Sequence, residues 1–205
     1  GRLAAGIALP TPAGFDWREA GLDPGETARV RAIIVAYTRG NLTNLLALTA
    51  LRLRLEQPQA PAGVLLPGAP PQPAQAALDP LSGITSLPPD VAAIVRALAG
   101  RHGGPADIIP SLYLHFAHWP GLLRVLPRGL AALCAPGELE TVREATRRLA
   151  EVEAAALLPH SLPPPAEMED AIRAALARFT TRVIPDLLPV CLALRQPFKA
   201  AAMPA

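Results

Sequence analysis

Two of the four histidines of the chain, His115 and His118, lie three residues apart and directly precede Trp119. A free imidazole has a pKa of about 6.5, so His115 could act as a general base near neutral pH. The His-x-x-His spacing could also bind a metal ion, but no Asp, Glu, His or Cys nearby in the sequence would supply a third ligand. We therefore expect no metal. The alternative to catalysis is that both histidines are half buried and pack around Trp119.

A second group of candidate side chains consists of two amides and two aromatic rings. A neutral amide both donates and accepts hydrogen bonds, so Asn41 could orient a water molecule without repelling it. It could equally cap a helix that starts after Gly40. Asn44 is either a pocket amide or a buried polar group that its neighbours satisfy. Tyr37 and Phe179 could line a substrate pocket, although such rings are more often part of the core.

Helix start and stop signals around the histidines predict a bend. A helix can begin at Pro110 and Ser111, because proline is tolerated in a first turn and a serine oxygen can accept from a free backbone N–H. Trp119 should end it, since Pro120 disfavours the α conformation of the residue before it. Pro120 can then open a second helix. We expect this bend to form the wall of whatever pocket the protein has.

The same kind of signal places the other helices. Asp23 can cap the start of a helix. Glu26, three residues after Asp23, would complete a capping box. We expect this helix to end at Gly40 and another to span residues 42–56. Further helices are expected at about 90–100, 138–158, 166–180 and 182–194. Because the chain is rich in Ala and Leu and poor in aromatic and β-branched residues, the predicted fold class is all-α.

Composition argues against several classes of partner. The net charge is +2 and no run of Lys or Arg exceeds two residues, so we expect no binding to nucleic acid. No stretch offers about 18 uncharged apolar residues, so we expect no membrane span. The first residues also lack the apolar region and cleavage site of a leader. The predicted location is therefore the cytoplasm.

Matches between the two ends of the chain predict an internal repeat, the alternative being chance similarity in a sequence rich in Ala and Leu. At an offset of 142 residues, Arg31-Ala32 matches Arg173-Ala174, Tyr37-Thr38 matches Phe179-Thr180, and Leu45-Leu46 matches Leu187-Leu188. Repeated units usually pack together to bury a shared core. Between the matching parts, residues 57–89 hold nine prolines and read as a connector. We therefore predict a first helical repeat at 1–56, truncated at its N-terminus, a connector at 57–89 and a second repeat at 90–205.

Three stretches carry a resemblance to a known family: YTRGNLTNLL at residues 37–46, PSLYLHFAHWPG at 110–121 and RFTTRVIP at 178–185. With them the chain resembles the group I 2-haloacid dehalogenases and their bacterial relatives. The resemblance implies an all-helical fold in which two tandem repeats form a pseudo-dimer with the active site between them. It also implies chemistry without a cofactor, in which an aspartate activates a water that displaces halide from C2 of a short haloacid.

Carried over residue by residue, the resemblance assigns Asn41 to the water-holding asparagine. The place of the catalytic aspartate, directly after Ser111, is occupied by Leu112, which cannot accept a proton. His115 lies three residues further on, nearly on the same helical face, and is the substitute base that the sequence offers. The resemblance places the substrate among residues of both repeats, namely Tyr37, Asn44, Ser111, Leu112 and Phe179.

We therefore expect a dehalogenase-like protein, a hydrolase of carbon–halogen bonds by resemblance, in which Leu112 removes the usual base. One alternative is a helical module without catalysis that binds a small carboxylic acid or is purely structural. Another is an enzyme of different chemistry that uses His115. A homodimer is a further expectation, because a second chain would replace what the truncated first repeat lacks.

Overall fold

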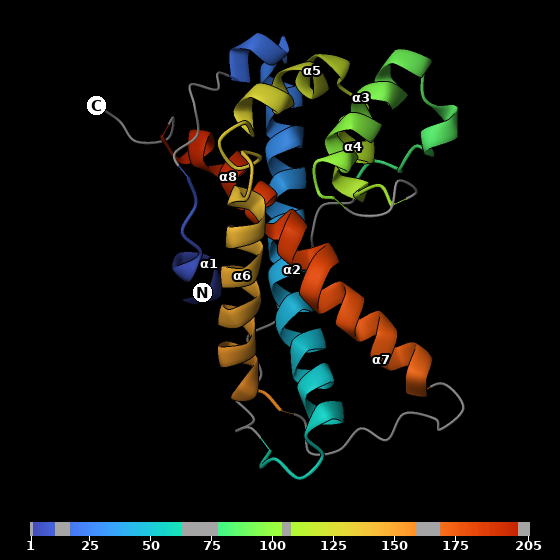
Figure 1. Cartoon of the computed structure of the whole chain (residues 1–205). Helices are drawn as coiled ribbons and strands as arrows, with labels where there is room; N and C mark the ends of the chain where they lie inside the picture. Colours follow the sequence, from blue (N-terminus) through green and yellow to red (C-terminus); the bar gives the residue numbers. More distant parts are fainter. Residues whose placement is uncertain (1, 11–16, 63–77, 104–107, 159–168, 201–205) are drawn as a thin grey trace. The chain divides into compact units, whose positions relative to one another are not determined.

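The computed structural model describes residues 2–10, 17–62, 78–103, 108–158 and 169–200, and all regular structure in these ranges is helical (Figure 1). The predicted all-α class is thereby confirmed for the described part of the chain. The elements are α1 (Arg2–Gly6), the 3₁₀ turn η1 (Trp17–Ala20), α2 (Pro24–Glu56), the 3₁₀ turn η2 (Ile84–Ser86), α3 (Pro89–Gly100), α4 (Ser111–Phe116), α5 (Pro120–Gly129), α6 (Glu138–Ala155), α7 (Glu169–Arg178), the π-helical turn η4 (Phe179–Val183) and α8 (Ile184–Ala200).

The chain divides into two compact units. The ion-pair unit comprises Gly1–Ala8, Arg39–Ala74 and Glu140–Pro189, and the Trp-bend unit comprises Leu9–Thr38, Gln75–Leu139 and Val190–Ala205. Helix α2 contributes residues 24–38 to the Trp-bend unit and residues 39–56 to the ion-pair unit. Residues 63–77 of the expected connector lie outside the described ranges, and the domain boundaries expected at residues 56 and 89 stay a prediction.

Helix α2 corrects one expectation. Gly40 was expected to end a helix and Asn41 to cap the next, but α2 runs without interruption over 33 residues through both. A glycine inside a helix costs only about 1 kcal/mol relative to alanine. The buried side chains of Val30, Ile34 and Leu45, on either side of Gly40, outweigh that cost. A continuous helix therefore forms where the local signals predict two.

A similar correction applies where the sequence predicts a break between helices ending at Thr180 and beginning at Arg182. The backbone there stays helical but widens into η4. Pro185 has no N–H group to donate to the carbonyl of Thr181, and its ring crowds that carbonyl, so the regular α pattern cannot pass through. The Thr181 hydroxyl also donates to the Ala177 carbonyl at 2.7 Å, which competes with the backbone donors of the turn.

The Trp-bend unit packs α3, α4 and α5 against one another and η1 against α5. Its core includes Leu112, Phe116, Leu122 and Leu126, all of them fully buried. Gly121 makes the approach of η1 to α5 feasible, because a Cβ at this position would lie 2.3 Å from the backbone oxygen of Ala20. No side chain fits at that distance. The second residue of α5 must therefore be a glycine for η1 to pack there.

The ion-pair unit is held together by arginines that reach between helices. Arg52 of α2 pairs with Glu151 of α6 at 2.5 Å, and Arg173 of α7 donates to the backbone oxygen of Leu55 at 3.0 Å. In Figure 1, α6 lies beside the C-terminal part of α2. Within the described residues, none of the helices has both the length and the apolar character that crossing a membrane requires.

Candidate functional site

The first turn of α2 is fixed by the predicted capping box. The backbone N–H of Glu26 donates to Asp23 Oδ1 at 2.7 Å, and the backbone N–H of Asp23 donates to Glu26 Oε2 at 3.0 Å. Two backbone donors that a helix start leaves without partners are thereby satisfied. This arrangement holds the Glu26 side chain against the helix start, one turn before Arg29.

The expected bend at Trp119 is confirmed. Helix α4 ends at Phe116, the backbone N–H of Trp119 donates to the carbonyl of Phe116 at 2.9 Å, and α5 starts at Pro120. The backbone of Trp119 lies outside the α region, with φ −127° and ψ 82°, and proline at the next position disfavours that region. Its indole is 5% exposed, so the bend rests on a buried ring. Ser111, however, does not cap α4, because Pro110 is the capping residue.

A chain of polar contacts connects α2, α4 and the segment before η2. The Tyr37 hydroxyl lies 2.7 Å from His115 Nδ1, and His115 Nε2 lies 2.9 Å from the backbone oxygen of Asp79. A carbonyl oxygen only accepts, so Nε2 carries the proton and donates to Asp79. In the neutral imidazole Nδ1 therefore accepts from the Tyr37 hydroxyl. Ser111 in turn is hydrogen-bonded to Tyr37.

The environment of Tyr37 favours its neutral form, and His115 beside it is buried. Burial raises the pKa of Tyr37 above its ordinary value of 10.0, and the hydrogen bond with Ser111 opposes that rise. His115 is 4% exposed, and both of its ring nitrogens are occupied by Tyr37 and Asp79. In this arrangement no ring nitrogen of His115 faces a water molecule that it could deprotonate.

A second neutral pair lies nearby in the same unit. His102 Nε2 and the Tyr113 hydroxyl are 2.8 Å apart, and both residues are buried. No spacing in the sequence indicates a contact between His102 and Tyr113. The missing information is the packing of α3 against α4, which brings residues eleven positions apart into contact.

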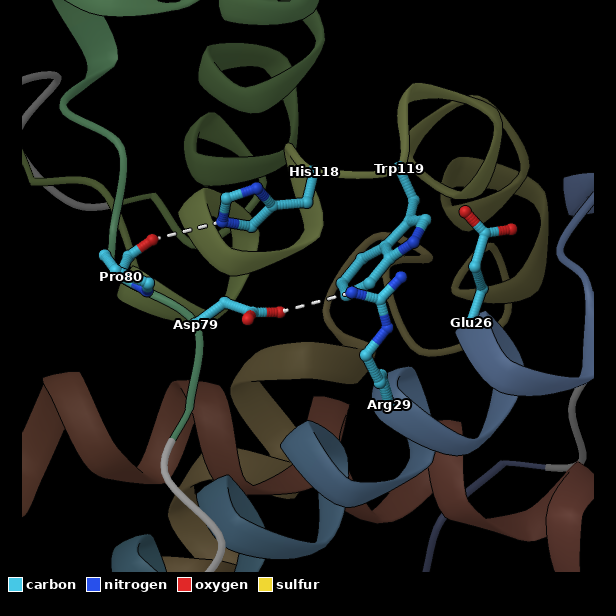
Figure 2. Close-up of a pocket in the computed structure, with 6 residues that line it drawn as sticks. All are labelled: Glu26, Arg29, Asp79, Pro80, His118 and Trp119. Carbon is cyan, nitrogen blue, oxygen red and sulfur yellow. Dashed lines mark hydrogen bonds and ion pairs between the residues drawn. The ribbon is translucent and has the colours of Figure 1, made fainter.

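A pocket of the Trp-bend unit lies at the bend. It has a volume of about 300 Å³ and is lined by Glu26, Arg29, Asp79, Pro80, His118 and Trp119. Figure 2 shows the guanidinium group of Arg29 against the Trp119 ring, with Asp79 on one side and Glu26 on the other. The guanidinium carbon lies 5.3 Å from the centre of the ring, within the range of a cation–π contact.

Polar groups of this pocket are only partly engaged with one another. Arg29 Nη1 lies 3.9 Å from Asp79 Oδ2, at the outer limit of an ion pair, and both side chains are substantially exposed. His118 donates from Nε2 to the backbone oxygen of Pro80 at 3.1 Å. Sequence reasoning named the wall of this pocket but not Arg29. The i, i+3 spacing of Glu26 and Arg29 was the available signal, because it places both on one face of α2.

The residues expected to form one site divide between the two units. Tyr37, Ser111, Leu112 and His115 belong to the Trp-bend unit, where Tyr37, Ser111 and His115 are joined by hydrogen bonds and Leu112 is fully buried. The other three belong to the ion-pair unit: Asn41 lies inside α2 and is half buried, Asn44 is exposed on α2, and Phe179 is 44% exposed in η4.

The ion-pair unit holds a polar cluster that sequence reasoning missed. Arg143 donates through Nε to Asp186 Oδ1, and both residues are nearly inaccessible to solvent. Arg143 also pairs with Glu140, and Arg182 lies 3.6 Å from the other oxygen of Asp186. Burial raises the pKa of Asp186, and the neighbouring arginines oppose that rise. The cluster lies next to η4 but lines no pocket that we identify among the described residues.

No group of three or more His, Cys, Asp or Glu side chains in the described ranges is placed to hold a metal ion. Comparisons with known proteins add no assignment: no model of a protein family matches the sequence, and no curated protein matches it significantly.

Proposed function

We propose that this protein is a helical relative of the group I 2-haloacid dehalogenases that binds a short carboxylic acid without hydrolysing a carbon–halogen bond. The pocket at the Trp bend receives the carboxylate. The proposal includes the two tandem repeats at an offset of 142 residues, packed as a pseudo-dimer. It rests on the three sequence stretches at 37–46, 110–121 and 178–185 together with the chemistry of this pocket.

Arg29 is the observation that carries the binding proposal. A guanidinium group presents donors in a planar fork that fits a carboxylate with two parallel hydrogen bonds. The Trp119 ring supports one face of the guanidinium, and Asp79 at 3.9 Å is too distant to occupy the fork. A ligand carboxylate can therefore replace a weak, solvent-screened contact with a bidentate one. The pocket volume of about 300 Å³ accommodates an acid of a few carbon atoms.

The absence of hydrolysis follows from two residues. Leu112 stands where the family has its aspartate, and its side chain is 0% exposed, so this position offers neither a base nor access for water. His115 is the alternative base, but both ring nitrogens are engaged with protein groups. A general base must reach the proton that it abstracts, directly or through one water.

Ligand-dependent thermal stability tests the binding proposal. Propionate at about 100 times its Kd should stabilise the folded protein by about 2.7 kcal/mol, and Arg29→Gln should abolish the shift. Arg96→Gln, an exposed arginine of α3 outside the pocket, is the matched control and should leave the shift unchanged. If no short carboxylate stabilises the protein at any concentration, the proposal is wrong.

The hydrolytic part is tested separately by measuring halide release from racemic 2-chloropropionate. We expect no release above the rate without protein, because no described group at the family's base position can activate water. Sustained turnover would contradict the proposed loss of hydrolysis and leave the binding proposal intact.

A further inference from the structure

The charged side chains that line the pocket do not favour a ligand whose only charged group is a carboxylate. Among the lining residues, Arg29 contributes one positive charge, and Glu26 and Asp79 contribute two negative charges. These three side chains together carry a formal net charge of about −1. A plain monocarboxylate would add a second negative charge to this small, partly desolvated space. Close like charges repel each other, and the repulsion grows as water is excluded.

Glu26 is positioned to bind a positive charge. The capping box uses its Oε2, and no hydrogen bond within the described residues occupies its Oε1. Figure 2 shows the Glu26 carboxylate beside the Trp119 ring, on the side of Arg29 that faces away from Asp79. Because the capping box holds the side chain, the carboxylate binds a ligand cation at a lower entropic cost than a mobile side chain would.

A simple organic cation does not fit the same arrangement well. The Trp119 face, which would otherwise attract a cation, is already covered by the guanidinium of Arg29. A ligand with only a positive charge would lie next to that guanidinium without a group to interact with it. The pocket thus offers an acceptor for a cation and a donor fork for an anion within one volume of about 300 Å³.

We propose that the ligand is a zwitterion, a small amino carboxylic acid whose carboxylate pairs with Arg29 and whose ammonium group pairs with Glu26. The short side chain of the ligand lies against the edge of Trp119. Such a ligand has no net charge, so the net charge of the pocket stays the same when it binds. Its carboxylate and its ammonium group each have a partner of opposite charge. This inference rests on the proposed carboxylate site and specifies its ligand class.

Calorimetric titration of the full chain with three matched compounds tests the inference. Alanine carries both charges, propionate lacks the ammonium group and isopropylamine lacks the carboxylate. We expect alanine to bind about tenfold more tightly than either of the others. Alanine and propionate of equal affinity would overturn the zwitterion and leave the carboxylate site standing. Isopropylamine as the tightest ligand would overturn the zwitterion in favour of a cation, and no binding of any compound would overturn both proposals.

Glu26→Gln separates the role of the charge from the role in folding. Glutamine preserves the capping box, because its amide oxygen can still accept from the backbone N–H of Asp23. The variant should lose the tenfold preference for alanine over propionate while its affinity for propionate stays the same or rises. Glu153→Gln in the ion-pair unit is the charge-matched control and should retain the preference. A Glu26→Gln protein that keeps the preference would overturn the assigned role of Glu26.

Discussion

Buried polar groups are satisfied by different chemistry in the two units of this protein. The Trp-bend unit uses neutral pairs, Tyr37 with His115 and His102 with Tyr113. The ion-pair unit uses full charges, with Arg143 bonded to Asp186 at its centre. A neutral pair loses little hydration on burial, whereas a charged pair regains its desolvation energy only when every partner is in place. The two units should therefore differ in their sensitivity to the loss of a single partner.

The contrast extends to the positions that the predicted internal repeat would align. Thr38 donates to the carbonyl of Ile34 at 2.7 Å, and its counterpart Thr180 donates to that of Leu176 at 2.8 Å. Their preceding neighbours differ, because Tyr37 is half buried and bonded to His115 while Phe179 is 44% exposed. A hydroxyl bond to the fourth preceding carbonyl is common for helical threonine, so it does not by itself establish a repeat. The aligned aromatic positions therefore have different roles.

The largest effect is expected at the charged centre. Asp186→Asn removes the buried carboxylate that Arg143 pairs with and should lower the free energy of unfolding by about 3–5 kcal/mol, since the buried guanidinium loses its buried counter-charge. Urea denaturation followed by circular dichroism measures the change. The loss should exceed that of any single substitution in a neutral pair of the other unit.

A double variant separates the cost of losing one buried partner from the contribution of the pair as a whole. Arg143→Met combined with Asp186→Leu replaces both partners by apolar side chains and should recover most of the loss. If the double variant is as unstable as Asp186→Asn alone, the loss of stability comes from packing or from the bond of Arg143 to Glu140. The proposed difference between the two units in their sensitivity to losing one partner would then be wrong.

A smaller effect is expected at the neutral pair. Tyr37→Phe leaves His115 Nδ1 buried without its donor and should cost about 1–2 kcal/mol. The reciprocal change at the aligned position, Phe179→Tyr, adds a hydroxyl to an exposed ring and should stay within about 0.5 kcal/mol. Both values come from the same urea denaturation experiment. Equal effects at the two positions would show that Tyr37 and Phe179 are equivalent after all.

Local signals in the sequence were sufficient for the Trp bend and for the start of α2. Proline before a helix and an Asp–Glu capping box restrict the backbone within a few residues, so no knowledge of tertiary contacts is needed. The same reasoning failed at Gly40. Apolar side chains that are buried before and after this residue outweigh the small free-energy cost of a glycine inside a helix. Local reasoning also missed the π-helical turn η4. The residue that disrupts the α-helix there is Pro185, which lies after the predicted break between Thr180 and Arg182.

Partners distant in the sequence could not be predicted from spacing. His115 was named as a candidate, but its bond to the backbone oxygen of Asp79 depends on how the segment before η2 passes α4. Every residue type has a backbone carbonyl and would offer the same acceptor at position 79, so no residue type indicates this contact. The Arg143–Asp186 pair, 43 residues apart, is of the same kind.

The smallest effect concerns the exposed charges of α6. Hydrogen bonds from Arg147 and Arg148 lower the pKa of Glu144 from 4.5 to about 2. A depressed carboxyl pKa means that the folded state loses its proton more readily than the unfolded chain. The stabilising contribution is therefore fully present above pH 4.5 and is lost as the pH falls through about 2. Because these side chains are accessible to solvent, replacing Glu144 should change stability only slightly near neutral pH.

The pKa of Glu144 can be measured directly by following its carboxyl carbon in an NMR titration. Arg147→Gln removes the largest cause of the shift and should raise the pKa of Glu144 towards 4.5, with a smaller rise for Arg148→Gln. Added salt should have the same direction of effect, because it screens exposed pairs. A pKa near 4.5 in the unmodified protein would mean that the arginines of α6 are mobile in solution. The ionic character of this unit would then be confined to the buried Arg143–Asp186 pair and its immediate neighbours.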